Sequence, residues 1–361
     1  MHAHSTSRRR TFLTLLVALA GSLLPLRAQA GDTYKWTVQY LIDNSQQVFG
    51  RSQKVWPRRN RGIAISPDGK FFYLGYMHGP NGGGEVRKVA AALMDDFTRA
   101  TSRAIEGPMG KAICCDDKGR VYIANEGEIL VYDANLHTQY LSIDVGMCEG
   151  MCVVREGQKL VLYVSDRQFG ALQRFTIEEN EASVSSAKME GFSDGSGQVT
   201  LQNSQNLRGV EVDGKGNIWV ADSDEGRVYR ISKDGKTVDT ADVANAMDIG
   251  FDGGRAFVTR GKDRVIAVLE TDTMKLIGNL SVPWEELELT PTGNNRGGML
   301  SGIVVVPGKG FWVTNESGQT ANQRSMYGRA DENTDFVDGK LYRDAYLDDN
   351  DPVLRALEVQ Q

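Results

Sequence analysis

Histidine, cysteine and proline are scarce in this chain of 361 residues, which contains 4, 4 and 9 of them. Two of the four histidines lie within the first four residues, so only His78 and His137 can belong to a folded domain. A zinc site built from a histidine cluster is therefore excluded. No two cysteines form a CxxC pair, which argues against a zinc ribbon or covalent haem attachment.

Long lysine and arginine runs are also lacking after residue 30, and the formal net charge of the whole chain is -6. Removing the first 30 residues, which carry four arginines and no acid, leaves a more acidic protein. Nucleic acid and anionic membranes are poor partners for such a surface. No integral membrane segment is expected after this leader is cleaved.

Residues 1–30 have the pattern of an export signal. Arg8-Arg9-Arg10 precedes an apolar segment that runs to Leu26, and Ala28-Gln29-Ala30 supplies a cleavage signal. The RRTFL sequence resembles a twin-arginine signal, although an ordinary secretory signal with three arginines is the alternative. We expect a periplasmic or secreted protein whose mature chain begins at Gly31.

The stretch from Leu207 to Lys236 contains one complete structural unit. Three short apolar runs alternate with polar turns rich in glycine and aspartate, such as the turn at 213–217. Strands of about five residues joined by such turns form an antiparallel meander.

Six imperfect copies of this unit follow one another, separated by 50, 38, 59, 39 and 54 residues. A repeat of about 40–50 residues with three or four strands is typical of a β-propeller blade. The copies open at Arg61, Lys111, Glu149, Arg208, Met247 and Ser301.

The fold class predicted is all-β: a six-bladed β-propeller of four-stranded antiparallel blades. The sixth copy has strands at 301–307 and 310–315, a long polar loop through Asp338 and a third strand at 340–346. The strand at 34–42 would supply its fourth and close the ring, which removes free sheet edges. The predicted organisation is signal 1–30, closing strand and connector 31–60, propeller 61–347 and acidic tail 348–361. A two-sheet sandwich and a seven-bladed ring are the alternatives.

The residue that opens each copy is expected to point towards the mouth of the central channel. The residues that end each second strand would surround it and form a concave site with converging polar groups. Together these positions give nine candidate ligand-binding residues: Arg61, His78, Lys111, Asn125, Glu149, Arg208, Asp222, Arg260 and Asn315.

Three of the opening residues are cations, which favours a carboxylate, phosphate or sulfate ligand at this mouth. The alternative is a structural plug of ion pairs, in which Arg208 pairs with Glu149 and Arg61 pairs with an acid such as Glu316. His78 is either a single general base or a loop histidine bonded to backbone.

The segment VDGKGNIWVADSDEGRV at 212–228 resembles an NHL repeat. The pattern of residues 61–316 is similar to the six-bladed gluconolactonase and senescence-marker-protein superfamily, which includes calcium-dependent lactonases. This resemblance implies a divalent metal held by Glu, Asn and Asp at blade-opening positions. Only Glu149 fits such a position directly. The alternative metal set is Glu149, Asn125, Asp222 and Asn315, with calcium as the candidate ion.

The four cysteines, Cys114, Cys115, Cys148 and Cys152, all fall in the second and third copies. Export to an oxidising compartment permits disulfides, and three pairings are open alongside free buried thiols. Two hypotheses of function remain. One is a propeller that binds a small, anionic ligand or a protein partner at its mouth; the other is a metal-dependent hydrolase or lactonase.

Overall fold

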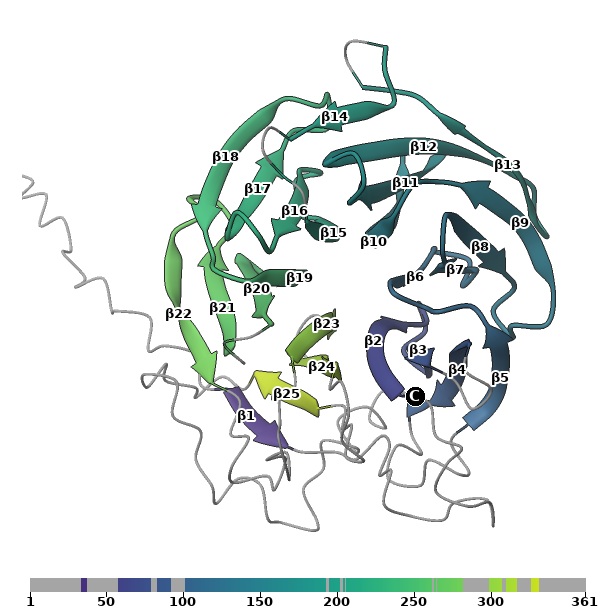
Figure 1. Cartoon of the computed structure of the whole chain (residues 1–361), viewed down its shortest axis with the longest axis horizontal. Helices are drawn as coiled ribbons and strands as arrows, with labels where there is room; N and C mark the ends of the chain where they lie inside the picture. The colour runs from purple at the N-terminus through teal and green to yellow at the C-terminus, as the bar shows by residue number, and fades with distance from the viewer. Residues whose placement is uncertain are drawn as a thin grey trace, which may run out of the picture.

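The computed structural model describes residues 34–37, 58–78, 83–91, 101–192, 195–201, 204, 206–261, 263, 265–281, 299–306, 310–316 and 326–330. These residues form antiparallel sheets arranged around a central axis (Figure 1). They contain no helix that is long and apolar enough to cross a membrane. The leader, the C-terminal tail and the strand expected at 340–346 lie outside the described residues.

Five sheets follow the chain in order, and each begins with its innermost strand. The first two are β2 (Arg58–Ile65), β3 (Phe71–His78), β4 (Gly84–Ala90), β5 (Thr101–Gly107), and β6 (Ile113–Cys115), β7 (Val121–Ala124), β8 (Glu128–Tyr132), β9 (Gln139–Asp144). The third is β10 (Cys148–Glu156), β11 (Lys159–Asp166), β12 (Ala171–Glu179), β13 (Val184–Met189). The fourth is β15 (Leu207–Val212), β16 (Ile218–Asp222), β17 (Arg227–Ile231), β18 (Thr237–Asp242), and the fifth is β19 (Ala246–Asp252), β20 (Arg255–Arg260), β21 (Val265–Glu270), β22 (Leu276–Ser281).

A further sheet has the order β1-β25-β24-β23 and joins the two ends of the chain. Its strands are β23 (Met299–Val306), β24 (Gly310–Glu316), β25 (Met326–Ala330) and β1 (Tyr34–Thr37). Four-stranded antiparallel propeller blades are thus confirmed. The six-blade count and the closure by the N-terminal strand stay predictions, because the segments flanking β1 and β25 lie outside the described residues.

Three boundaries predicted from the sequence are wrong. The first blade begins at Arg58, inside the expected connector. The segment Met326–Ala330 is a strand paired with β24, within the expected polar loop. An extra strand, β14 (Gln198–Thr200), pairs with β12 inside the expected loop at 194–206. The sequence did not reveal β14 and β25 as strands, because their apolar runs are short and polar residues surround them.

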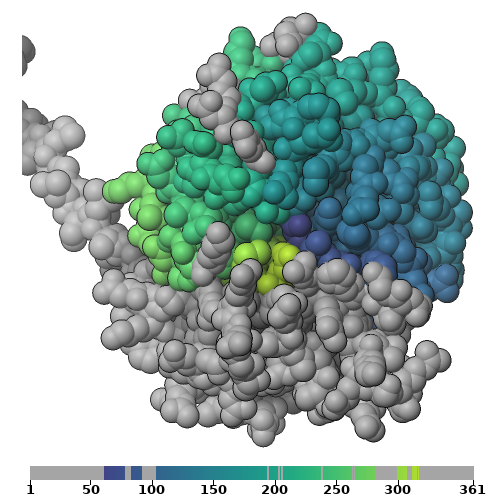
Figure 2. Space-filling model, in the orientation of Figure 1, coloured from purple at the N-terminus to yellow at the C-terminus, as the bar shows by residue number. Residues whose placement is uncertain are grey.

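Apolar side chains fill the spaces between neighbouring blades. One cluster draws Tyr122 and Val131 from the second blade and Leu162 and Phe175 from the third. Equivalent clusters join the first blade to the second, the third to the fourth and the fourth to the fifth. The described blades therefore form one continuous arc in the space-filling view (Figure 2). This packing holds the inner strands at fixed spacing around the axis.

Candidate functional site

The opening residues lie in β-bulges at one end of the inner strands. The register of five inner strands shifts at this level against their second strands: Asn60/Ile63, Cys148/Gly150, Leu207/Val210, Ala246/Asp248 and Leu300/Ile303. A bulge bends the strand and re-aims its side chains. The bulges are the physical reason why residues from different blades converge at one mouth.

Glycine follows the opening residue in four of these copies because the inner strands nearly touch there. A Cβ atom on Gly150 would lie 2.1 Å from the carbonyl oxygen of Arg208 on the next blade. One on Gly302 would lie 2.4 Å from the carbonyl oxygen of Arg61. Both distances are too short for any side chain, so this close approach requires glycine.

Hydroxyl groups from second strands hydrogen-bond across the same gaps. Ser165 Oγ donates to the carbonyl oxygen of Arg208 at 2.5 Å, and Thr259 Oγ1 donates to that of Ser301 at 2.8 Å. Thr314 Oγ1 donates to the carbonyl oxygen of Arg61 at 2.8 Å. Each hydroxyl thus ties its blade to the opening residue of the following blade, and we call these three bonds the hydroxyl clamps.

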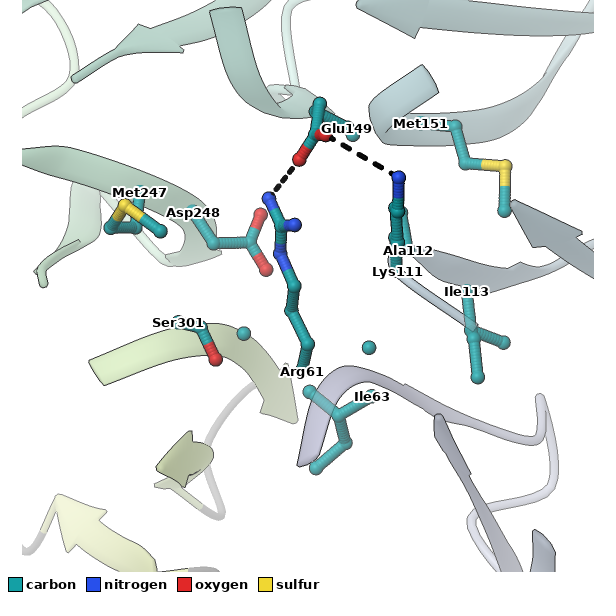
Figure 3. Close-up of a pocket in the computed structure, with 13 residues that line it drawn as sticks. Arg61, Ile63, Lys111, Ala112, Ile113, Glu149, Met151, Met247, Asp248 and Ser301 are labelled. Carbon is teal, nitrogen blue, oxygen red and sulfur yellow. Dashed lines mark hydrogen bonds and ion pairs between the residues drawn. The ribbon is translucent and has the colours of Figure 1, made fainter. Parts of the chain in front are cut away.

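The side chains of Arg61 and Lys111 converge on the carboxylate of Glu149 (Figure 3). It accepts hydrogen bonds from Arg61 Nη2 and from Arg208 Nη1, the latter at 2.7 Å. Lys111 Nζ and Arg167 Nη1 each lie 3.9 Å from Glu149 Oε1. The side chain of Glu149 is only 2% exposed, so four cations surround a single buried carboxylate.

These neighbours perturb the ionisation of the cluster. Burial alone would raise the pKa of Glu149, but Arg61, Arg208 and Lys111 together hold it below its usual value. Burial lowers the pKa of Arg208 to about 10, and the nearby charge of Arg61 adds to this effect. Glu149 is therefore ionised at neutral pH. Arg208 is also charged at neutral pH, although burial and the nearby Arg61 destabilise its charged form.

The positive groups outnumber the carboxylates that contact them. The second contacting acid is Glu316, whose Oε2 lies 3.9 Å from Arg61 Nε. Four cations thus face two carboxylates within ion-pair distance. Lys111 Nζ has no hydrogen-bond acceptor among the described residues, since its distance to Glu149 exceeds that of a hydrogen bond. The small pocket of about 30 Å³ beside these groups can hold an object the size of one water molecule.

Asp248 is a member of this pocket that the sequence did not single out. Its carboxyl accepts hydrogen bonds from the backbone N–H groups of Ile249 at 3.0 Å and Ile303 at 2.9 Å. Burial raises its pKa to about 7, with smaller opposing effects from these N–H groups. A signal was present in the sequence: Asp248 occupies the place where four other copies have glycine after the opening residue.

Three of the predicted site residues whose side chains are described, Asn125, Asp222 and Arg260, neither line the mouth pocket nor contact Glu149. The carboxyl of Asp222 accepts hydrogen bonds from Ser204 and from two backbone N–H groups of its own loop. Asn125 Oδ1 accepts from Met109 N–H at 3.2 Å, and Arg260 bonds Asp263 and Ala244. These groups hold the loops that follow their strands, as short polar side chains do in turns.

The structure describes the backbone at His78 and Asn315 but not their side chains. Both residues lie near the ends of second strands, His78 in β3 and Asn315 in β24. Their proposed roles in ligand or metal binding therefore stay predictions.

A calcium site does not fit this arrangement of described residues. Both Arg61 and Arg208 donate to Oε2 of Glu149, and Lys111 and Arg167 lie 3.9 Å from Oε1. These four cations would repel a divalent metal ion. The side chains of Asn125 and Asp222 are committed to their own loops. Among the described residues, no three His, Cys, Asp or Glu side chains are grouped to hold a metal.

A larger cavity of about 320 Å³ continues down the channel below the mouth. The four cysteines are free, and three of them, Cys114, Cys115 and Cys152, line this cavity. Burial raises the pKa of each of these thiols, so all three are protonated at neutral pH. The structure thus contains free thiols, which were the alternative to disulfide bonds.

Sequence and structure comparisons agree with this architecture. Residues 103–262 match the family described as the SMP-30/Gluconolactonase/LRE-like region, a stretch that runs from β5 to β20. This match supports a resemblance to gluconolactonase-like β-propellers over that stretch of the chain. The recognition made from the repeat pattern is confirmed. An NHL repeat at 212–228 stays a prediction.

Solved structures of low sequence identity are similar to this propeller. A luciferin-regenerating enzyme is 11% identical with a TM-score of 0.51, over 85% of this chain and 99% of that one. A calcium-binding protein, regucalcin, from Agrobacterium tumefaciens is 10% identical with a TM-score of 0.49, over 86% of this chain and 97% of that one. A protein of unknown function from Bacteroides caccae is 10% identical with a TM-score of 0.49, over 69% and 87%. No curated protein sequence matches the chain. Of these three, the luciferin-regenerating enzyme has a TM-score above 0.5, and at 11% identity it supports the fold alone.

Proposed function

We propose that this propeller binds a small anion, or the anionic group of a larger ligand, at the mouth of its channel. The observation that carries the proposal is the excess of cations around Glu149. A purely structural plug would balance its charges, whereas here Lys111 and Arg167 lie beside a carboxylate that already accepts from two arginines. An anion at the mouth would satisfy the remaining donors.

The cellular setting belongs to the same proposal. The signal pattern at residues 1–30 supports export to the periplasm or outside the cell, and the pairing of β1 with β25 supports a six-bladed ring closed by the N-terminal strand. A small-molecule ligand or a protein partner with an exposed carboxylate or phosphate would then meet the mouth outside the cytoplasm.

Isothermal titration of the mature protein with sulfate, phosphate and gluconate tests the proposal. We expect one anion to bind, and Lys111→Met to weaken its binding about tenfold, since a partly buried charge-assisted contact contributes on the order of 1.5 kcal/mol. Lys188→Met is the matched control, because this lysine is 76% exposed on β13 and pairs with Glu190. Equal affinities in both variants, or no binding of any anion, would show that the mouth is a structural plug.

A metal-dependent hydrolase or lactonase is the second candidate, and the family match is the observation that favours it. The related regucalcin is described as calcium-binding, which makes calcium the metal to test. The cations at the mouth oppose this candidate. Calcium that remains bound after dialysis, together with chelator-sensitive lactone hydrolysis, would establish it and displace the anion proposal.

A further inference from the structure

The cavity below the mouth is distinct from the anion site in its chemistry. Its volume of about 320 Å³ lies within the range of ligand pockets, about 300–1,000 Å³. Most of the residues that line it are apolar residues of the inner strands, among them Ile65, Val153, Phe251 and Val305, while polar atoms supply the larger share of the lining surface. Ile63, Ile113, Met151 and Asp248 line both spaces and therefore lie between the two.

Two carboxyl groups interrupt this apolar wall. Glu211 Oε1 accepts hydrogen bonds from Cys152 Sγ at 2.8 Å and from the N–H of Val212 at 3.0 Å. The other oxygen of Glu211 has no hydrogen-bond partner among the described residues. The second carboxyl is that of Asp248, which extends from the neighbouring strand β19. Among the described residues it accepts from two backbone N–H groups and from no side chain.

Neither carboxyl has a cationic partner within ion-pair distance in the described part of the chain. Arg61 on β2 and Glu211 on β15 are the charged groups that act on Asp248. Arg61 is itself paired with Glu149 and Glu316. An ionised carboxylate in an apolar cavity without a counter-charge is costly, and a cation entering the cavity would remove that cost.

We propose that this channel cavity is a second binding site, which takes a small organic cation with an apolar body. The ammonium group would lie at Glu211 and Asp248, and the alkyl chain would pack against the isoleucine and valine side chains. The two carboxyls disfavour an organic anion, and the apolar lining residues favour an alkylammonium over a hydrated inorganic ion.

Titration calorimetry with n-hexylammonium, 1-hexanol and hexanoate as probes tests this site in the intact protein. We expect hexylammonium to bind at least tenfold more tightly than hexanol, and hexanoate to show no binding. Burial raises the pKa of Asp248 to about 7, so an ammonium beside it should release a proton near neutral pH. Titrations in two buffers with different ionisation enthalpies measure that proton. Equal affinity for hexylammonium and hexanol would overturn the proposal.

Two variants locate the binding. The double variant Glu211→Gln and Asp248→Asn should lose the preference for hexylammonium over hexanol. Val304→Phe places a larger side chain at a half-buried position on β23 and so reduces the volume of the cavity. It should abolish binding of both probes while leaving the carboxyls intact. Unchanged hexylammonium affinity in Val304→Phe would place binding elsewhere and overturn the proposal, even where the double variant does not fold. Lys111→Met should leave hexylammonium binding unchanged, which separates this site from the mouth.

Discussion

Replacing Glu149 by glutamine removes the carboxylate on which the mouth cations converge. Arg61, Lys111 and Arg208 have side chains only 8%, 12% and 14% exposed, so water cannot fully solvate them after the change. Removing one partner of a buried ion pair costs about 3–5 kcal/mol. With three cations left near one another, we expect the free energy of unfolding to fall by an amount in this range.

Thermal unfolding converts this loss into a measurable shift. For a domain of this size the entropy of unfolding is about 0.6 kcal/mol/K, so Glu149→Gln should lower Tm by roughly 5–8 °C. Added sulfate should recover part of that loss, because it can occupy the vacated centre of positive charge. Glu178→Gln on the exposed end of β12 is the matched control and should change Tm by less than about 1 °C.

The pH dependence of the free energy of unfolding in acid gives an independent test of the contribution of Glu149. Its folded pKa lies below the ordinary value of 4.5, so its stabilising contribution is present above pH 4.5 and is lost as the pH falls through the folded pKa. Glu149→Gln should therefore flatten the loss of stability below pH 4.5. If the variant unfolds at the same temperature as Glu178→Gln, gains no more from sulfate than the unaltered protein, and loses stability below pH 4.5 as the unaltered protein does, the cluster does not stabilise the fold as described.

Two further predictions concern the inner strands. The raised pKa of Asp248 means that the folded protein holds a proton that the unfolded chain loses above about pH 4, so this group lowers stability as the pH rises towards 7. Urea unfolding from pH 5 to 8 should therefore show the unaltered protein losing stability relative to Asp248→Asn; parallel curves would contradict the assigned burial. Gly150→Ala should cost about 1–3 kcal/mol or more by overpacking against the next strand, whereas Gly214→Ala, with no atom within 4 Å, should change stability by less than about 0.5 kcal/mol. Similar melting temperatures for these two alanine variants would refute the close approach of the inner strands.

The repeat pattern was enough to predict the propeller because its information is local. Each turn such as 213–217 needs glycine and aspartate for its own geometry, and Asp213 does accept the N–H groups of Lys215 and Asn217. Each strand likewise needs an apolar face to pack against the next blade. The spacing of such turns therefore reveals blades without any knowledge of distant contacts.

The candidate site could be predicted from the sequence only at the opening residues, where a single residue in each blade determines which side chain faces the mouth. The pairing of Arg208 with Glu149 and the contact of Arg61 with Glu316 agree with the ion-pair alternative raised from the sequence. The ends of the second strands were misjudged, because Asp222 turns into its own loop rather than towards the axis. Whether a side chain caps a loop or faces a channel depends on the twist of the blade, which no local pattern records.

The channel cavity was not predictable for a related reason. Glu211 follows Val210 in an ordinary alternating strand, and nothing in the sequence distinguishes it from a solvent-facing acid. Its surroundings are made by Cys152 and by residues from other blades. The bulge in β19 that brings Asp248 to the same space is likewise a feature of paired strands rather than of one segment.

The hydroxyl clamps have a consequence for how the mouth can evolve. Ser165, Thr259 and Thr314 hold the main chain of the opening residues, and Thr314 also bonds the side-chain hydroxyl of Ser301 at 3.0 Å. The identity of an opening side chain can therefore change while the frame that presents it stays in place. Cation, carboxylate, thioether and hydroxyl already occupy equivalent positions in this one ring. A descendant could exchange its ligand by substituting these few residues, with no need to redesign the scaffold.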